Sequence, residues 1–367
     1  MTTHKAVATV AIRGKLALID APTVAPTGRQ VCVHVEWTAS TPLDLHQNDG
    51  GLLVTHPQIL GDGIAGTVVE TGPDVKNLAV GDKVFGFAFK ENMQKAYQEY
   101  ATVSETSLGK LPSEFSLQEA ITLPNNTVTV FHAVTKDLGL PLEWPRLPSH
   151  TNPHADTPIL IWGGASSCGQ YALQILHAWG YTNLLATASP RHHEYLRSLG
   201  ARHTFDYRDV DVASKIQRAV DNNTRTGPAV PFVLDCIASQ QGSLTQIAGV
   251  AQKGTRVAAL LPVIVRDATD DVAPEYAMNV QAAVDWAEGV EARGVRTHFY
   301  EDDVFFREHL QSSVVPELLA TGIVKPNKQR IVEGATLLER AQAAMDLLRR
   351  KDVSGERLVW RVSDLEL

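Results

Sequence analysis

The feature that most constrains the fold is a regular alternation of short apolar runs with helical patterns in the second half of the chain. The apolar runs are Ile159–Trp162, Leu184–Thr187, Thr204–Phe205, Phe232–Leu234 and Arg256–Leu261. Amphipathic stretches at Gln170–Trp179 and His192–Leu199 separate the first three of them. Strands that alternate with helices form a parallel sheet with right-handed crossovers. We therefore predict an α/β fold that contains a doubly wound parallel sheet.

The first third of the chain instead has the pattern of strands and turns. Val31–Val35 alternates, glycines punctuate Gly61–Gly72, and Val80–Phe89 carries a Gly-Asp turn ahead of β-prone residues. Near the C-terminus, helical spacing over Leu337–Leu348 precedes a predicted strand at Leu358–Val362. Because a chain of 367 residues exceeds what one hydrophobic core usually serves, we expect two domains.

Composition narrows the class of partner. The formal net charge of −8 speaks against nucleic acid or an anionic membrane surface as the main partner. Met1–Val10 has one Lys and no long apolar core, so we see no secretory signal in it. The longest strongly apolar stretch, Val257–Val265, is interrupted by Pro262 and is too short to span a bilayer.

The cysteines and histidines do not form a metal or disulfide pattern. Three cysteines stand far apart without a C-x-x-C pair, so a disulfide framework is not expected and a reducing, cytoplasmic location fits. His150 and His154 have an i, i+4 spacing, but prolines in the irregular stretch Pro141–Pro158 prevent a helix there. We interpret both as exposed loop residues.

A glycine turn follows the first strand of the alternating region. Ile159–Leu173 reads I-L-I-W-G-G-A-S-S-C-G-Q-Y-A-L, a strand, turn and helix in which Ser166 replaces the middle glycine of a G-x-G-x-x-G pattern. Such a turn presents helix N–H groups to a pyrophosphate. The alternative is a glycine turn in an α/β protein without a nucleotide. The predicted contacts are Gly163, Gly164, Ala165, Ser166, Ser167, Cys168 and Gly169.

The end of the second strand indicates which dinucleotide would bind. An NAD site usually places Asp or Glu about twenty residues downstream, where it binds the ribose hydroxyls. Thr187–His193 reads T-A-S-P-R-H-H and has no acid. Ser189, Arg191 and His192 could donate to a 2′-phosphate, and Pro190 lies among them. We therefore predict NADPH; the alternative is a basic helix start on the surface.

With these motifs in hand, the chain resembles the medium-chain dehydrogenase/reductase superfamily over nearly its full length. Leu60–Gly72 (L-G-D-G-I-A-G-T-V-V-E-T-G) and Val80–Val84 (V-G-D-K-V) are similar to its N-terminal signature, and Ala120–Thr129 to the segment that leads into the cofactor domain. Phe205–Arg208 (F-D-Y-R) and Ser354–Val359 (S-G-E-R-L-V) resemble the quinone-oxidoreductase branch. Together with T-A-S-P, the set resembles fungal secondary-metabolism members, including trans-acting enoyl reductases of polyketide pathways.

The resemblance implies a domain plan. We expect a GroES-like, β-rich catalytic domain over residues 1–130 and a Rossmann NADP-binding domain over 131–305. Residues 306–367 would form a C-terminal segment that returns to the catalytic domain.

The chain departs from the zinc-dependent members at their metal ligands. By motif alignment those positions are Thr41, Asp62 and Asn125, and none is a soft zinc ligand. Phe89–Tyr97 has no cysteine for a structural zinc lobe. We therefore expect no metal. The chemistry that remains is hydride delivery to a C=C bond conjugated to a carbonyl, where hydrogen bonds stabilise the charge that develops on oxygen.

The resemblance also implies residues beside the nicotinamide. Asp44 and His46 lie in T-P-L-D-L-H, and His46 takes the position of a lysine in many enoyl reductases. His46 could pass a proton near neutral pH, or it could pack against the cofactor ribose. Asp44 is expected to bond neighbouring backbone in a turn.

Further candidates come from the same resemblance. Asn125 and Thr129 match positions that face nicotinamide and substrate, and Asn125 could orient a carbonyl or cap a helix. Tyr207 matches an aromatic near the adenosine phosphate, or is a strand-end tyrosine that reaches water. Two further pairs complete the predicted site: Leu260 and Leu261 at the end of the fifth strand, and Ser354 and Gly355 in a tail segment over the cofactor.

Three functional hypotheses remain at this point. The first is a stand-alone NADPH reductase of enones or quinones, and the second a trans-acting reductase whose partner is a polyketide synthase. The third is a non-catalytic NADP-binding relative, which the intact cofactor elements disfavour. The sequence predicts a monomer or a homodimer, and it does not identify the substrate.

Overall fold

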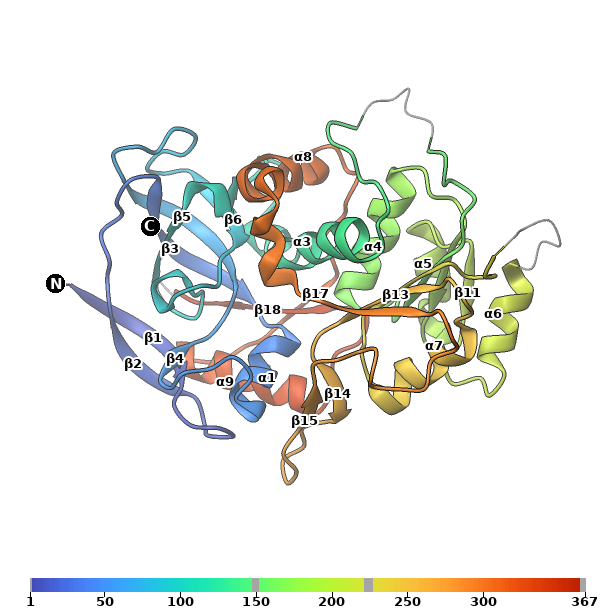
Figure 1. Ribbon diagram of the computed structural model, residues 1–367. Coiled ribbons are helices and arrows are strands. Elements are labelled where there is room, and N and C mark those ends of the chain that lie inside the picture. The colour runs from blue at the N-terminus through green and yellow to red at the C-terminus, as the bar shows by residue number, and fades with distance from the viewer. Residues whose placement is uncertain (1, 147–151, 221–226, 364–367) are drawn as a thin grey trace. The chain divides into compact units, whose positions relative to one another are not determined.

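The computed structural model describes residues 2–146, 152–220 and 227–363, and it divides into two compact units (Figure 1). Unit 1 comprises Met1–Asn125, Asp267–Pro274 and Tyr300–Leu367, and unit 2 comprises Asn126–Arg266 and Glu275–Phe299. Our predicted boundaries lay after residues 130 and 305, whereas the units divide after 125 and 299. His150 lies outside the described residues, and His154 lies in a turn.

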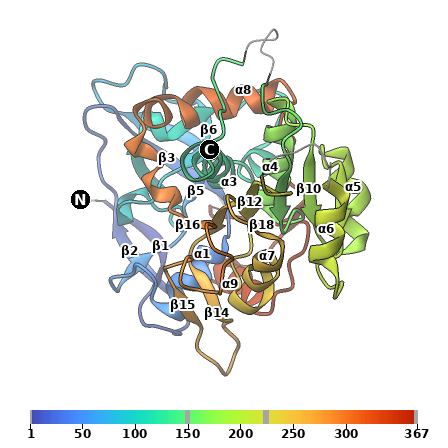
Figure 2. The ribbon, with the colours of Figure 1, turned by 45° about the vertical axis from the view of Figure 1, so that its right-hand side comes forward.

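Unit 2 is built on a six-stranded parallel sheet in the order β11-β10-β9-β12-β13-β16. Figure 2 labels β10, β12 and β16 of this sheet. Its strands are β9 (Ile159–Trp162), β10 (Leu184–Thr187), β11 (His203–Phe205), β12 (Phe232–Asp235), β13 (Arg256–Leu260) and β16 (Glu291–Val295). Every residue of β9 and β10 is buried, as expected for central strands that helices cover on both faces. The helices of the unit are α4 (Ser167–Ala178), α5 (His193–Ser198), α6 (Val212–Val220) and α7 (Thr245–Val250), and a hairpin of β14 (Val263–Arg266) and β15 (Glu275–Ala277) completes it.

Unit 1 is built on a seven-stranded, mostly antiparallel sheet in which β17-β18-β3-β5-β6-β8 are neighbours and β7 also pairs with β3. These strands are β3 (Gln30–Ala39), β5 (Gly63–Thr71), β6 (Lys83–Phe87), β7 (Tyr100–Ser104), β8 (Leu108–Lys110), β17 (Gln329–Ile331) and β18 (Arg357–Arg361). A smaller sheet contains β1 (Thr3–Thr9), β2 (Ala17–Pro22) and β4 (Gln58–Ile59). The helices are α1 (Pro42–Gly50), α2 (Leu117–Ala120), α8 (Val315–Ala320) and α9 (Leu337–Arg349), while α3 (Pro124–His132) begins in unit 1 and continues in unit 2.

The C-terminal segment supplies part of the core of unit 1. Ala341 and Met345 of α9 and Trp360 of β18 are buried in the same apolar cluster as Val33 of β3 and Ile64 of β5. The predicted α/β class, with one parallel sheet and one β-rich part, is confirmed. Among the described residues, no helix combines the length and apolarity needed to cross a membrane.

Candidate functional site

The predicted glycine loop joins β9 to α4 in unit 2. Gly163 has φ of +79°, a conformation that an L side chain rarely adopts. A Cβ on Gly169 would lie 2.5 Å from the carbonyl oxygen of Gly163, so only glycine lets the helix approach the strand this closely. Ser166 is the N-cap of α4, and its hydroxyl accepts the N–H of Gly169 at 3.0 Å. The first-turn N–H groups of this helix suit an anion.

The loop is tied to the neighbouring strand β10. Gly163 N–H donates to Thr187 Oγ1 at 3.0 Å, and Gly164 N–H donates to the Thr187 carbonyl at 2.9 Å. In the parallel register Trp162 pairs with both Thr187 and Asp235. The carboxyl ends of these strands therefore share one edge of the sheet, which is where open α/β sheets bind ligands.

Two cysteines meet at the same edge. Cys236 follows β12 and lies against Cys168, whose thiol raises the pKa of Cys236; burial raises it further. Cys168 lies in the first turn of α4, and its side chain is buried. The residues predicted from the sequence for this site did not include Cys236.

A polar cluster lies at the ends of β10 and β11. Arg208 donates to the Ser189 hydroxyl at 2.7 Å and to the Tyr207 hydroxyl at 3.3 Å, and its guanidinium lies 5.0 Å from the centre of the Tyr207 ring. Its nearest carboxylate is that of Asp206, at 3.6 Å. Arg208 is the cation that the sequence reasoning missed, although the motif F-D-Y-R contains it.

The cations that the sequence did predict, Arg191 and His192, follow Ser189 of this cluster closely in sequence. Pro190 to His192 form a short turn, in which Arg191 Nε donates to His192 Nε2 at 3.2 Å. Burial lowers the pKa of His192, and Arg191 and His193 lower it further. The lowered pKa makes a positive charge on His192 less favourable.

Two further predictions fall in unit 2. The hydroxyl of Thr129 lies 3.0 Å from that of Thr297, a partner that the sequence did not suggest. Leu260 ends β13 and Leu261 follows it, and both are half-buried. Leu261 packs over Gly294 of β16, where a Cβ would approach within 2.6 Å. The two leucines thus lie at the same sheet edge as the glycine loop.

In unit 1 the predicted residue Asp44 is the centre of a buried hydrogen-bond network. As the third residue of α1, it accepts the N–H of Thr41 at 2.7 Å, the N–H of Gly61 at 3.1 Å and the hydroxyl of Tyr97 at 3.1 Å. Burial, with Asp62 nearby, raises the pKa of Asp44 to about 6 although the hydrogen bonds oppose this. Ser40 lies 2.6 Å from the Tyr97 hydroxyl and extends the network.

His46 lies on the same helix and is buried. Desolvation lowers its pKa to about 4, although Asp267 and Asp49 act in the opposite direction. The imidazole is therefore neutral at pH 7 and can donate a hydrogen bond. Transfer of a proton by His46 near neutral pH stays a prediction, while the lowered pKa favours its neutral form.

Two of the three positions aligned with zinc ligands contact cations of the chain, and the third is a helix N-cap. Asp62 forms a buried ion pair with Lys95 at 2.9 Å, and Arg357 donates to the amide oxygen of Asn125 at 3.3 Å. Thr41 N-caps α1. Asn125 itself lies inside α3, one residue after its start, rather than at a helix N-cap. Neither Lys95 nor Arg357 was predicted from the sequence.

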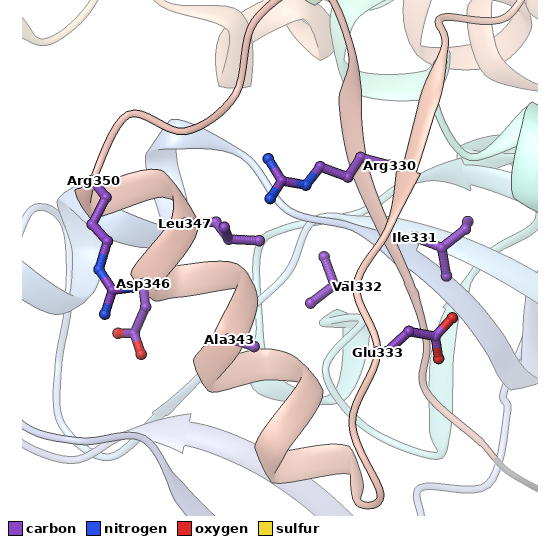
Figure 3. Close-up of a pocket in the computed structure, with 8 residues that line it drawn as sticks. All are labelled: Arg330, Ile331, Val332, Glu333, Ala343, Asp346, Leu347 and Arg350. Carbon is purple, nitrogen blue, oxygen red and sulfur yellow. The ribbon is translucent and has the colours of Figure 1, made fainter.

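The tail residues Ser354 and Gly355 lie just before β18, with Glu356 between them and the strand. Ser354 is exposed, and Gly355 has φ of +74°. In unit 1, α9 and β17 also enclose a hollow of about 390 Å³ (Figure 3). None of the predicted site residues lines it; its walls are Arg330, Ile331, Val332, Glu333, Ala343, Asp346, Leu347 and Arg350. Across the described ranges, no group of three or more His, Cys, Asp or Glu side chains has an arrangement that could hold a metal ion.

Comparison with known proteins identifies the family. The alcohol dehydrogenase GroES-like domain family matches residues 27–129. The chain is 35% identical over 217 residues to the trans-enoyl reductase tazE of Aspergillus terreus. This match covers 56% of this chain and 69% of that protein. The chain belongs to the medium-chain dehydrogenase/reductase family, with the fungal trans-enoyl reductases. It is an oxidoreductase, and the enoyl and quinone reductases of this family depend on a nicotinamide cofactor.

The similarity extends over the full length. The lovastatin nonaketide synthase enoyl reductase component lovC of Aspergillus terreus is 29% identical over 349 residues, 91% of this chain and 89% of that protein. The quinone oxidoreductase of Coxiella burnetii has the same fold, with a TM-score of 0.71 at 22% identity over 99% of this chain and 100% of that one. The resemblance inferred from the motifs is therefore confirmed.

Proposed function

We propose that this protein is an NADPH-dependent reductase of C=C bonds conjugated to a carbonyl. The observation that carries the choice of cofactor is the cluster at the ends of β10 and β11. There the Arg208 guanidinium is bonded to the Ser189 hydroxyl, and no acid follows β10 before Glu194. An NAD site would place a carboxylate where this chain places a hydroxyl and a cation.

The chain fits the dinucleotide in two further respects. The close approach of Gly169 to Gly163 opens the N-terminus of α4, where Ser166 and Ser167 lie, to a pyrophosphate. Arg208 and Ser189 would hold the 2′-phosphate, with Tyr207 packed on the guanidinium. When bound, NADPH supplies a hydride.

Reduction of a conjugated C=C bond fits the residues of unit 1. The charge that develops on the carbonyl oxygen is spread over an enolate, which neutral hydrogen-bond donors can support. Asn125 offers an amide, and His46 is a neutral imidazole. Metal assistance is disfavoured because Lys95 and Arg357 already bring positive charge to Asp62 and Asn125.

Relatives named trans-enoyl reductase, and one named as the enoyl reductase component of a nonaketide synthase, support a carrier-bound acyl chain as the substrate class. We propose that a polyketide synthase presents the carrier-bound acyl chain to the reductase in the cytoplasm.

The test is NADPH oxidation by the purified protein with quinones, enals and enoyl thioesters, free and carrier-bound. We expect turnover of enoyl thioesters, fastest on the carrier. Turnover of quinones alone would favour a quinone oxidoreductase. Oxidation of simple alcohols with NADP, with every unsaturated carbonyl left untouched, would overturn the proposal.

A further inference from the structure

One face of helix α9 lines the hollow between α9 and β17. The residues of α9 and its C-cap that line it are Ala343, Asp346, Leu347 and Arg350, at positions i, i+3, i+4 and i+7. Ala343 and Leu347 are half-buried, and Val332 opposite them is buried. The floor of the hollow is therefore apolar, and the exposed Arg350 lies at its rim.

The strand on the other side of the hollow, β17, is the edge strand of the large sheet. Among the described residues its one strand partner is β18. The N–H of Val332 donates to the Val359 carbonyl at 2.9 Å. The Lys328 carbonyl accepts the N–H of Arg357 at 2.8 Å. Because backbone groups of successive strand residues point to alternate sides, those of Ile331 point away from β18, and no described residue bonds them there.

An extended peptide added to this free edge would continue the sheet beside the hollow. Figure 3 shows Arg330 and Val332 on the α9 side of β17, and Ile331 and Glu333 on the opposite side. Successive side chains of an added strand would alternate in the same way, with residues two apart on one face and about 7 Å from each other. Every second side chain of the peptide would therefore enter the hollow, whose volume of about 390 Å³ accommodates a leucine.

The charges around the hollow indicate what else the peptide carries. Among the described residues, the exposed guanidinium of Arg350 has no carboxylate partner. Asp346, by contrast, is paired with Arg349 at 2.7 Å. Arg330 donates to the Asp352 carbonyl at 2.6 Å. A carboxylate on the peptide therefore complements the one arginine of the hollow that is not already bonded within the chain.

We propose that this hollow is a docking site for an extended segment of a partner polypeptide. The segment pairs with the free edge of β17, places an apolar side chain against Leu347, and places a carboxylate two residues away against Arg350. Backbone pairing supplies affinity and the hollow supplies selectivity, as in other cases of strand addition. This inference goes beyond the proposed function and does not depend on it, because none of the residues predicted for the cofactor or the substrate lines the hollow.

The probe is a peptide with fluorescein at its N-terminus and an amide at its C-terminus, titrated with the full chain by fluorescence polarisation. In T-T-L-T-E-T the leucine and the glutamate share one face, and the reversed order T-E-T-L-T-T tests addition in the opposite direction. We expect saturable binding of one order. Glutamine in place of the glutamate should weaken that binding about fivefold.

Variants of the chain locate the binding site. Arg350→Met should weaken binding about fivefold, and it should make no difference to the glutamine peptide. Lys351→Met is the matched control: it removes the same charge from the next residue, which pairs with Asp267 and does not line the hollow. Ala343→Leu fills the hollow from a half-buried position and should weaken binding about tenfold or more.

Strand addition is tested without changing the protein. Two versions of the bound peptide carry N-methyl groups on alternate residues, one version on each edge of the peptide. Because an N-methyl group removes a donor, only the version methylated on the edge that faces β17 should lose binding, by about tenfold or more. Equal affinities of the two versions would overturn strand addition.

Other occupants of the hollow give different results. A second copy of the chain would appear in sedimentation velocity as a concentration-dependent dimer that Ala343→Leu dissociates, and it would overturn the proposal in favour of self-association. Absence of binding by both peptide orders, or equal affinity of the wild type and a folded Ala343→Leu, would overturn it as well. Circular dichroism of each variant establishes that it is folded, and Arg350→Met with its control decides if Ala343→Leu is not.

Discussion

Helix α1, which carries Asp44 and His46, is clamped to α9 by one buried ion pair. Arg349 donates to both carboxylate oxygens of Asp49, from Nε at 2.7 Å and from a terminal nitrogen at 2.8 Å. The Asp49 side chain is 1% exposed and that of Arg349 13%. The carboxylate raises the pKa of Arg349, so the arginine stays charged. We predict that Arg349→Met strongly destabilises the protein.

The magnitude follows from burial. Removing one partner of a buried pair usually costs about 3–5 kcal/mol, because the other charge is left buried and unpaired. Arg349 also donates to Asp346 at 2.7 Å, but Asp346 is one-third exposed and can turn to water. We therefore expect a loss of about 3 kcal/mol for Arg349→Met, and a smaller loss for Arg349→Lys, which keeps the charge without the two-pronged contact.

Urea unfolding followed by far-UV circular dichroism measures this loss. In the double variant Asp49→Asn with Arg349→Met, much of the stability should return because no charge is left unpaired. Lys351→Met is the matched control: its partner Asp267 is 2.6 Å away, but both side chains are largely exposed. Breaking that pair should cost under about 1 kcal/mol. Equal losses for the two single variants, or no recovery in the double variant, would refute the reasoning.

Two further predictions concern the cofactor and metal. NADPH should bind about a hundredfold more tightly than NADH, because charge-assisted hydrogen bonds to the 2′-phosphate contribute about 1.5–3 kcal/mol each. Arg208→Met should cut this preference about tenfold without changing the NADH Kd; isothermal titration that finds equal affinities in the wild type would contradict the NADPH assignment. Elemental analysis should find no stoichiometric zinc, and full loss of activity to a chelator that zinc reverses would contradict the metal-free mechanism.

The parts of the site that are local in sequence could be predicted, and those that depend on distant contacts could not. The glycine loop could be predicted because its strand, turn and helix are consecutive in the sequence from Ile159 to Ala178. Arg208 meets Ser189 from 19 residues away, and Lys95 meets Asp62 from 33. Arg357 meets Asn125 across 232 residues of chain. No sequence pattern predicts a contact between residues so far apart in the chain.

The same distinction applies to the fold. Central strands such as β9 and β10 are continuous apolar runs and were predicted, since burial on both faces requires that composition. The edge strand β16 reads E-A-R-G-V and was missed, because only its second and last residues are buried. Helix α6 was missed as well, although it has one apolar stripe, formed by Val212, Ile216 and Val220.

The buried state of His46 leads to a last prediction. With a pKa of about 4, the fraction of imidazolium at pH 7 is about one in a thousand. Forming the imidazolium there would add about 4 kcal/mol to any step that used it as the acid. We infer that His46 acts as a neutral hydrogen-bond donor and that kcat will not show a titration of this residue between pH 6 and 8.

Substitutions separate the two roles. His46→Gln keeps a neutral donor of similar reach, so it should retain most of kcat, whereas His46→Ala should lose about tenfold or more. If His46 were the acid, glutamine and alanine would be equally damaging, because neither can release a proton.

Burial of His46 also fixes the sign of its effect on the pH dependence of stability. A histidine whose folded pKa is depressed favours unfolding as the pH falls from 6.5 toward 4, because the unfolded chain then binds the proton more readily. His46→Gln should therefore weaken the loss of stability with acid over that range. A loss that is the same in the wild type and in His46→Gln would show that His46 binds its proton as readily in the folded protein as in the unfolded chain.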